Sequence, residues 1–306
     1  MAFTNTVQRL AAALLAPLLV LALLAATAPL RAEEQHAPAL WKIEDADSEI
    51  WLFGTVHILN PALQWRTDAI SDAFTKADTL IVEAPAVDID PAVQQQLVMK
   101  YGLNTTGNSF IDELSDEGRA NFVKALVNLG QPANAIMNFA PFRPWLAGVT
   151  VQVMQIQARG GHPDAGVDTM LWREAKEAGK ELAYFETLEE QMQVFGGLSP
   201  EDEIHFFEEG MRQLNEEPEL LDHIVESWKS GDVDGLGAKM QAAMVGQDAL
   251  YDALLTNRNK NWAAQIDALL EGEGKIFIAV GAAHLAGDHS VQDLLEADYG
   301  IKAVRQ

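Results

Sequence analysis

Four short apolar segments along the chain each lead into a polar residue. Two of them, "IWLFGTVH" and "KIFIAVGAAH", reach His57 and His284 through the same Gly-x-x-His ending. The other two, "TLIVEAP" and "ELAYFET", carry Glu83 and Glu186 near their ends. Runs of this length that are rich in β-branched and aromatic residues are typical of buried strands. The pattern therefore predicts four strands, each with a histidine or a glutamate at its carboxyl end.

Amphipathic segments separate these strands. Residues 66–77 precede the second strand and residues 167–180 precede the third, and both have the apolar spacing of a helix that faces a core. Strands that alternate with helices favour an α/β fold with parallel strand pairs. In open sheets of that kind, ligands bind outside the carboxyl ends of the strands. We therefore expect the two histidines and the two glutamates to lie together at one edge of the sheet.

Two longer regions have helical periodicity and little strand character. They cover about residues 91–160 and 189–265. In the second region, Ser199 and Pro200 are suited to be the N-cap and the first residue of a helix. No low-complexity linker divides the chain. The predicted architecture is one α/β domain over residues 33–306, with a mixed β-sheet core and two long helical insertions.

The first 32 residues have a different character. Arg9 precedes a long apolar stretch that ends in small residues and is followed by the acidic "EEQHAP". This order is typical of a secretory signal peptide, and we expect cleavage after Ala32 and a periplasmic or secreted mature chain without stable membrane insertion. An uncleaved anchor is the alternative, because the apolar stretch approaches the roughly 20 residues that span a bilayer.

The charge and the composition of the chain exclude several classes of partner and site. The formal net charge is −24, and loss of the signal peptide, which carries Arg9 and Arg31, makes it about −26. So acidic a surface repels nucleic acid and anionic lipid headgroups. The sequence contains no cysteine, which excludes disulfides, thiol catalysis and thiolate metal ligands. A cysteine-free chain with a large core is compatible with a bacterial periplasm.

The residues at the strand ends suit a metal site. Neutral imidazoles and a carboxylate are common ligands for zinc, manganese, iron or cobalt, and such a metal acidifies a bound water. The glycine shortly before each histidine fits close backbone approach, or a φ angle that a side chain would forbid. The alternative is that each histidine is only a satisfied residue at a strand end. The repeated motif and the neighbouring carboxylates keep both interpretations open.

Three further residues are candidates for the site, each with a structural alternative. Glu186 is either a catalytic acid or base, or a simple strand-end carboxylate. Arg258 is either a cation that serves a site made of carboxylates or a member of a surface ion pair. Asp168 begins a predicted helix, which favours an N-cap over a catalytic role. The other histidines considered have no strand-end context and are expected at the surface: His162, His205, His223 and His289.

Six segments resemble the TraB/GumN family, which includes the Tiki metalloproteases. In order and spacing they are "WLFGTVH", "IVEAP", "GVDTMLWREA", "YFETLEEQ", "RNKNW" and "IAVGAAHLAGDHSVQDLL". The resemblance implies an α/β fold with histidines and a glutamate at a shared site, and for the Tiki branch a metal-dependent peptidase activity. The ligands of a divalent ion such as manganese, cobalt or zinc would then fall on His57, Glu83 and His284.

The sequence leads to one main hypothesis and one alternative. The main hypothesis is an exported metal-dependent hydrolase of the peptidase type that acts on a peptide or another small substrate. Its catalytic residues would be Glu83, Glu186 and Arg258, with Glu186 as the general base. The alternative is a non-catalytic periplasmic protein that uses the same cleft to sequester a peptide, haem or metal.

Overall fold

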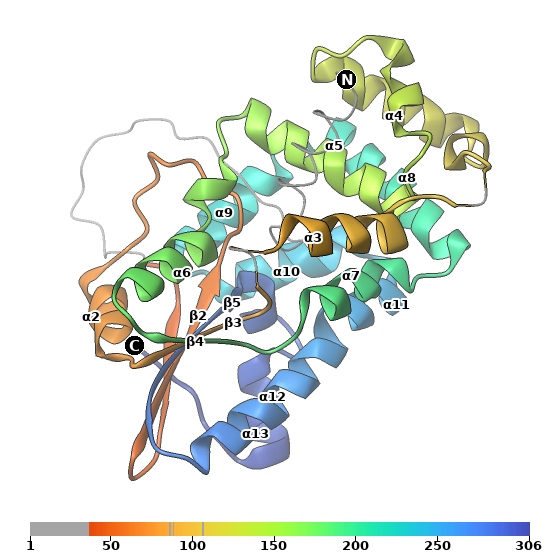
Figure 1. The fold of residues 1–306 in the computed structure, drawn as a ribbon. Coiled ribbons are helices and arrows are strands. Elements are labelled where there is room, and N and C mark those ends of the chain that lie inside the picture. The colour runs from red at the N-terminus through yellow and green to blue at the C-terminus, as the bar shows by residue number, and fades with distance from the viewer. Residues whose placement is uncertain (1–36, 86, 88, 106) are drawn as a thin grey trace, which may run out of the picture.

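The computed structural model of the chain describes residues 37–85, 87, 89–105 and 107–306 (Figure 1). The predicted signal peptide over residues 1–32 lies outside the described residues. Within the described ranges the chain forms one sheet of six strands, with helices on both of its faces and a large group of helices beyond one end. No helix in this part of the chain is long and apolar enough to cross a membrane.

The four predicted strands are neighbours and form the parallel part of the sheet, with β4 at its edge. Along the sheet the order is β4-β3-β5-β2-β1-β6. β3 pairs in parallel with β4 and β5, and β5 pairs in parallel with β2. This parallel pairing confirms the predicted α/β fold. The bounds of the four strands are β2 (Ser48–Thr55), β3 (Thr79–Val82), β4 (Glu181–Tyr184) and β5 (Gly274–Gly281).

Two short strands that the pattern of apolar residues does not predict complete the sheet. β1 (Leu40–Glu44) pairs antiparallel with β2, and β6 (Val304–Arg305) pairs antiparallel with β1. Together with the parallel strands they make the sheet mixed, as expected for the fold class. β6 has only two residues, both exposed, and therefore has no apolar run that could have announced it.

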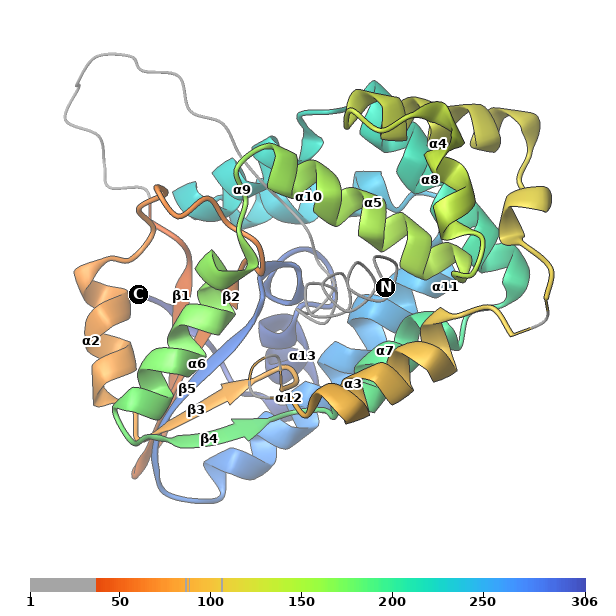
Figure 2. The ribbon, with the colours of Figure 1, turned by 45° about the horizontal axis from the view of Figure 1, so that its top comes forward.

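Helices cover both faces of the sheet. α2 and α6 lie on one face, and α12 and α13 lie on the other (Figures 1 and 2). The predicted helices at residues 66–77 and 167–180 are confirmed by α2 and α6. The bounds of the four helices are α2 (Asp68–Lys76), α6 (Val167–Glu177), α12 (Asn257–Leu270) and α13 (Val291–Tyr299).

The alternation of side chains along the strands divides the core in two. Phe53 and Phe277 point to the face that α2 covers, and the ring of Phe74 packs edge-on against Phe277. Their neighbours in sequence point the other way, where Leu52 packs in one cluster with Trp262 of α12. Residues one apart in a strand face opposite sides, so a continuous apolar run indicates a strand buried on both faces.

The two regions predicted as helical insertions are helical. In Figure 2 the arrowheads of β3 and β4 point toward this group, at α3 and α7. Ser199 is the N-cap and Pro200 the first residue of α8, as predicted. The α-helices of the group are α3 (Pro91–Leu97), α4 (Asp116–Asn128), α5 (Pro144–Ala158), α7 (Leu188–Gly196), α8 (Pro200–Glu216), α9 (Leu220–Ser230), α10 (Val233–Ala243) and α11 (Asp248–Tyr251).

Short helices of other types join these elements. Two are π-helical turns, η1 (Val98–Gly102) and η5 (Asp252–Thr256). Single π-turns inside helices are frequent at functional sites, and η5 leads directly into α12. The 3₁₀ turns are η2 (Phe110–Asp112), η3 (Ala133–Phe139), η4 (Pro163–Ala165) and η6 (Ala282–Leu285).

Candidate functional site

The four parallel strands place the predicted residues at one edge of the sheet. His57 lies two residues after β2, and His284 lies in η6, directly after β5. Glu83 follows the last residue of β3, and Glu186 lies two residues after β4. All four side chains are buried.

Gly281, at the end of β5, shows how closely these side chains converge. A Cβ atom added to Gly281 would lie 2.9 Å from Oε1 of Glu83, 3.4 Å from Nε2 of His57 and 3.6 Å from Cδ2 of His284. Gly54 is equally constrained, because its Cβ would lie 3.0 Å from Cα of Ala282. Neither glycine has a positive φ angle. The glycines of the two Gly-x-x-His motifs are therefore needed for close backbone approach.

Arg258, in the first turn of α12, joins the two glutamates. Its Nε lies 3.1 Å from both carboxylate oxygens of Glu186, and its Nη2 donates to Glu186 and, at 2.6 Å, to Oε2 of Glu83. Its Nη1 donates to the Leu254 carbonyl and to Nε2 of His284, both at 3.0 Å. These contacts occupy all five N–H groups of the guanidinium. The alternative of a surface ion pair is wrong, because Arg258 is only 8% exposed.

The two carboxylates that share Arg258 differ in their acidity. Burial alone would raise the pKa of Glu83, but the charge of Arg258, assisted by the histidines and the Gly281 N–H, lowers that pKa to about 2. For Glu186, burial dominates and raises the pKa, although Arg258 opposes the shift. Glu186 is thus more than a free strand-end carboxylate, since it belongs to the same buried network as Glu83.

His284 is held as a neutral imidazole in one tautomer. Its Nε2 accepts from Arg258, so its Nδ1 carries the proton and donates to Oδ1 of Asn259 at 2.5 Å. Asn259 faces His284 with its oxygen because its Nδ2 donates to the carbonyl of His289 at 2.9 Å. Burial, followed by the charge of Arg258, lowers the pKa of His284 to about 3.

His57 faces a negative charge instead. Its Nδ1 lies 3.2 Å from Oδ1 of Asp168, and both side chains are buried. Burial alone would lower the pKa of His57, but the carboxylate of Asp168, assisted by the charge of Glu83, more than offsets this and raises the pKa. The N-cap role favoured for Asp168 is wrong, because the N-cap of α6 is Gly166 and Asp168 lies inside the first turn.

A cavity of about 10 Å³ lies beside this pair, between His57, Glu83, Asp168 and Trp172. Within the described ranges, Nδ1 of His57, both carboxylate oxygens of Asp168 and Nε1 of Trp172 are buried without a hydrogen-bond partner. The short distance from Nδ1 to Oδ1 is therefore an unaligned charge contact. A cavity of this size is close to the lower limit for one water.

The groups that contact the two histidines fit a metal site. A histidine that binds a metal usually donates its other ring N–H to a carboxylate or carbonyl oxygen, and Asp168 and Asn259 occupy those places for His57 and His284. Two of the atoms that would bind the metal itself, Nε2 of His284 and Oε2 of Glu83, are bonded to Arg258 instead. As placed, no three His, Asp or Glu side chains of the described residues lie close enough to hold an ion. A metal here requires Arg258 to release Glu83 and His284.

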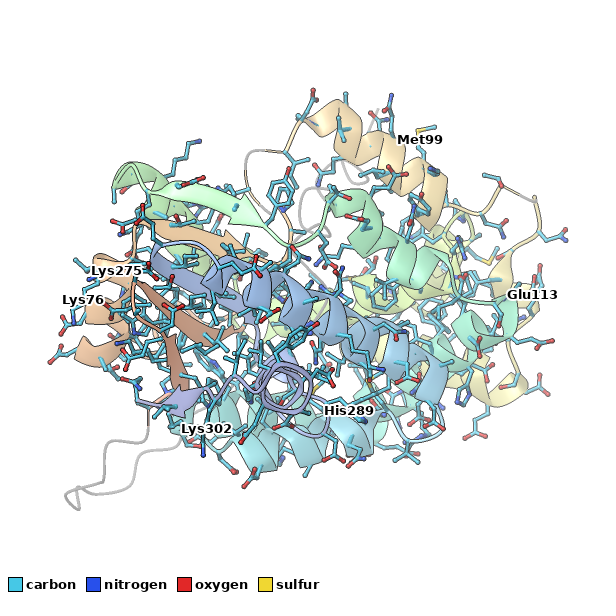
Figure 3. All side chains as sticks on the ribbon, turned by 90° about the horizontal axis from the view of Figure 1, so that it is seen from below. Lys76, Met99, Glu113, Lys275, His289 and Lys302 are labelled. Atoms are coloured by element: carbon cyan, nitrogen blue, oxygen red, sulfur yellow. The ribbon has the colours of Figure 1, made fainter. Side chains whose placement is uncertain are left out.

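Other residues complete the site or lie away from it. Sequence reasoning missed two amides of the site: Asn259, and Gln191, whose Nε2 donates to Glu83 at 3.2 Å. Both lie within the segments "RNKNW" and "YFETLEEQ", whose similarity to a family was the only available signal. The four histidines that were predicted to lie at the surface are all exposed: His162, His205, His223 and His289. Figure 3 labels His289.

Comparison with known proteins gives a family and two relatives. The model of the TraB/PrgY/gumN family matches residues 39–302. A protein named "Uncharacterized protein YbaP" from Escherichia coli (strain K12) is 22% identical over 269 residues, which covers 88% of this chain and 96% of that protein. The protein of the same name from Shigella flexneri matches with the same identity and coverage. No solved structure gives a significant match.

Proposed function

The chain belongs to the TraB/PrgY/gumN family, and we propose that it is an exported metal-dependent hydrolase of the peptidase type. The observation that supports this most directly is the buried pair of carboxylates on one arginine. The pKa of Glu83 is lowered and that of Glu186 is raised, although both contact Arg258. Carboxylates whose pKa values are pushed apart suit a site in which one holds charge and the other exchanges a proton.

The two carboxylates have different roles in this proposal. Glu83, with His57 and His284, would hold a divalent ion, which acidifies a water molecule and polarises a carbonyl group. Glu186 keeps a proton more readily than an ordinary glutamate, since burial raises its pKa. It can therefore take a proton from the attacking nucleophile and deliver it to the leaving group.

The neighbouring groups position these residues. Asn259 fixes the His284 tautomer, and the charge of Asp168 favours a proton on the facing Nδ1 of His57, which leaves Nε2 as the ligand atom. Arg258 can stay on Glu186 through Nε while its terminal nitrogens leave Glu83 and His284. Those nitrogens can then stabilise negative charge that develops on a carbonyl oxygen.

One observation favours the alternative function, a non-catalytic periplasmic protein that sequesters a peptide, haem or metal. Every N–H group of Arg258 already has an acceptor among the site residues and the Leu254 carbonyl. An ion-pair network that is complete in this way can serve as a rigid floor for a bound ligand without any reaction.

The test is elemental analysis of the purified mature protein before and after chelation. We expect about one ion per chain, strongly reduced occupancy in His57→Ala and His284→Ala, and wild-type occupancy in the control His223→Ala, which alters an exposed residue. Glu186→Gln should keep the metal and lose cleavage of a mixed peptide library. Full occupancy in both site variants would end the metal proposal, and metal loss without cleavage by the wild type would favour the binding protein.

The export part of the proposal rests on the pattern of residues 1–32. Mass spectrometry of a periplasmic fraction should find a chain that begins at or near Glu33. An intact Met1 terminus in the membrane fraction would support an anchor instead.

A further inference from the structure

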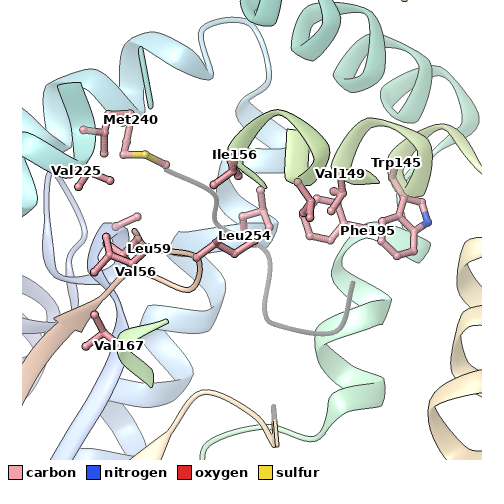
Figure 4. Close-up of a cluster of buried hydrophobic side chains, with 14 of the residues drawn as sticks. Val56, Leu59, Trp145, Val149, Ile156, Val167, Phe195, Val225, Met240 and Leu254 are labelled. Carbon is pink, nitrogen blue, oxygen red and sulfur yellow. The ribbon is translucent and has the colours of Figure 1, made fainter. Parts of the chain in front are cut away.

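A second and larger cavity lies in the helical region. It has a volume of about 140 Å³ and is bounded by α5, α7, α8, α9, α10 and η5. Most of its walls are apolar, and Figure 4 labels four of its residues, Val149, Phe195, Met240 and Leu254. An apolar cavity of about this size is large enough to bind benzene in another protein. The cavity therefore suits a compact apolar group.

Two side chains bring hydrogen-bond acceptors without a donor to the wall of the cavity. Gln155 and Gln247 line it, and the Oε1 atom of each is buried without a hydrogen-bond partner within the described ranges. The lining residue Gln213 differs, because its amide donates to Glu209 and to the Ala243 carbonyl. Buried acceptors are normally satisfied. Rotation about the terminal bond of either glutamine, which has a broad torsional minimum, can turn the oxygen toward the cavity.

The charge of the cavity walls further restricts the kind of ligand that can bind. Glu217 is the one ionisable side chain among the described residues that line the cavity. A carboxylate or phosphate would thus meet a like charge and no counterion. The ligand that satisfies these walls is neutral, apolar and compact, and it carries an N–H or O–H donor for the glutamine oxygens.

The cavity and the charged site share one element of the chain. Leu254 lines the cavity, while its main-chain carbonyl accepts from Nη1 of Arg258. The π-helical turn η5 is the element that carries both contacts. A ligand group in the cavity therefore lies against the same turn that holds Arg258 in place.

We propose that this cavity binds a leucine-sized apolar side chain together with a neighbouring amide N–H, and that it selects such a residue in a peptide bound at the charged site. The assignment of a peptide rests on the proposed function. The apolar walls take the side chain, and the oxygens of Gln155 and Gln247 accept from the amide. Peptides with glycine at that position leave the walls without contact.

The test measures binding without turnover. The purified mature protein is titrated by calorimetry with N-acetyl-leucinamide and with N-acetylglycinamide, and the leucine probe should bind at least tenfold more tightly. Ala243→Leu fills part of the cavity and should weaken binding of the leucine probe at least tenfold. Ala242→Leu, one residue earlier on α10 and exposed outside the cavity, is the matched control and should bind as the wild type does.

Gln247→Met is a second variant, since it removes an acceptor and keeps an unbranched side chain. It should weaken binding of the leucine probe several-fold with an unchanged melting temperature. Equal binding of the two probes, or equal effects of Ala243→Leu and Ala242→Leu, would overturn the proposal. Binding of the free probe but not of the peptide Gly-Gly-Leu-Gly-Gly would overturn the assignment to a peptide residue. Peptide cleavage without a preference for leucine would refute this inference alone and leave the hydrolase proposal intact.

Discussion

The two Gly-x-x-His units have the same spacing of glycine and histidine and opposite electrostatic settings. Both histidines follow neighbouring parallel strands, β2 and β5, and both are buried. His57 meets the carboxylate of Asp168, which raises its pKa, whereas His284 meets the guanidinium of Arg258 and has its pKa lowered to about 3. One imidazole is therefore disposed to hold a proton, and the other is neutral.

The difference comes from the helices rather than from the strands. Asp168 belongs to α6, which covers one face of the sheet, and Arg258 belongs to α12, which covers the other. The repeated motif places each ring at the sheet edge. The charge that each ring meets is set by a helix: α6, which is far from His57 in the sequence, and α12, which directly precedes β5 and His284. The same spacing of glycine and histidine thus gives two histidines of different chemistry.

The largest effect on this contrast is expected from Arg258→Met. The substitution leaves Glu83 and Glu186 buried without their shared counterion, and the removal of one partner of a buried ion pair costs about 3–5 kcal/mol. It also removes one cause of the lowered pKa of His284, so that pKa should rise toward that of an ordinary histidine. Urea unfolding measures the first effect, and NMR titration of the ring protons measures the second.

Arg212→Met is the matched control for this change. Arg212 pairs with Glu209 and Glu216 on its own helix near the surface, and loss of exposed pairs costs about 0–1 kcal/mol. Equal losses of unfolding free energy in the two variants would show that Arg258 does not neutralise a buried pair.

A smaller effect, in the dependence of stability on pH, is expected from His284→Gln. Between pH about 6.5 and about 3 the unfolded chain binds a proton at this histidine that the folded chain does not bind. The group thus lowers stability as the pH falls, by at most about 1.4 kcal/mol per pH unit. In the glutamine variant, urea unfolding between pH 6 and pH 4 should show a shallower loss of stability.

His223→Gln is the control for this measurement, because His223 is exposed on α9. It is expected to keep the wild-type profile. A profile of His284→Gln that is as steep as the wild type would contradict the neutral state inferred for His284.

Much of the sheet follows from local patterns, and much of the site does not. The four parallel strands and their polar ends are predictable because a strand that is buried on both faces consists of a continuous run of apolar residues. β1 is not predicted because the charged residues Lys42 and Glu44 leave it without a continuous apolar run. β6 is not predicted because it has only two residues. The helical insertions are predictable as helices, whereas their packing against one another is not.

Arg258 and Asp168 show what local reasoning cannot supply. An isolated arginine in an acidic chain suggests a surface ion pair, and its burial follows only from contacts with Glu83 and Glu186, 175 and 72 residues away. Asp168 stands where an N-cap is expected. The N-cap is instead Gly166, where a Cβ atom would lie 2.2 Å from the His57 carbonyl oxygen, and Asp168 is buried inside the first turn of α6.

The smallest effect, and the one opposite in sign to that of His284, is expected from Asp168→Asn. The raised pKa of His57 means that the folded chain holds a proton more tightly than the unfolded chain does. This contribution is fully present below the unfolded pKa of about 6.5 and is lost as the pH rises through the folded pKa. The asparagine variant lacks the charge that causes the shift, so it should lose more unfolding free energy at pH 6 than at higher pH.

Unfolding free energies at pH 6 and pH 8.5 for the wild type and Asp168→Asn measure this change. Asp164→Asn is the control, since Asp164 pairs with Arg173 in the open and the substitution should cost less than about 1 kcal/mol at both values. If Asp168→Asn costs the same at the two pH values, the carboxylate does not hold a proton on His57, and the two histidines differ only at Arg258. If Asp168→Asn costs more unfolding free energy at pH 6 than at pH 8.5, the raised pKa of His57 is confirmed beside the lowered pKa of His284. Acid then destabilises the protein through His284 and stabilises it through His57.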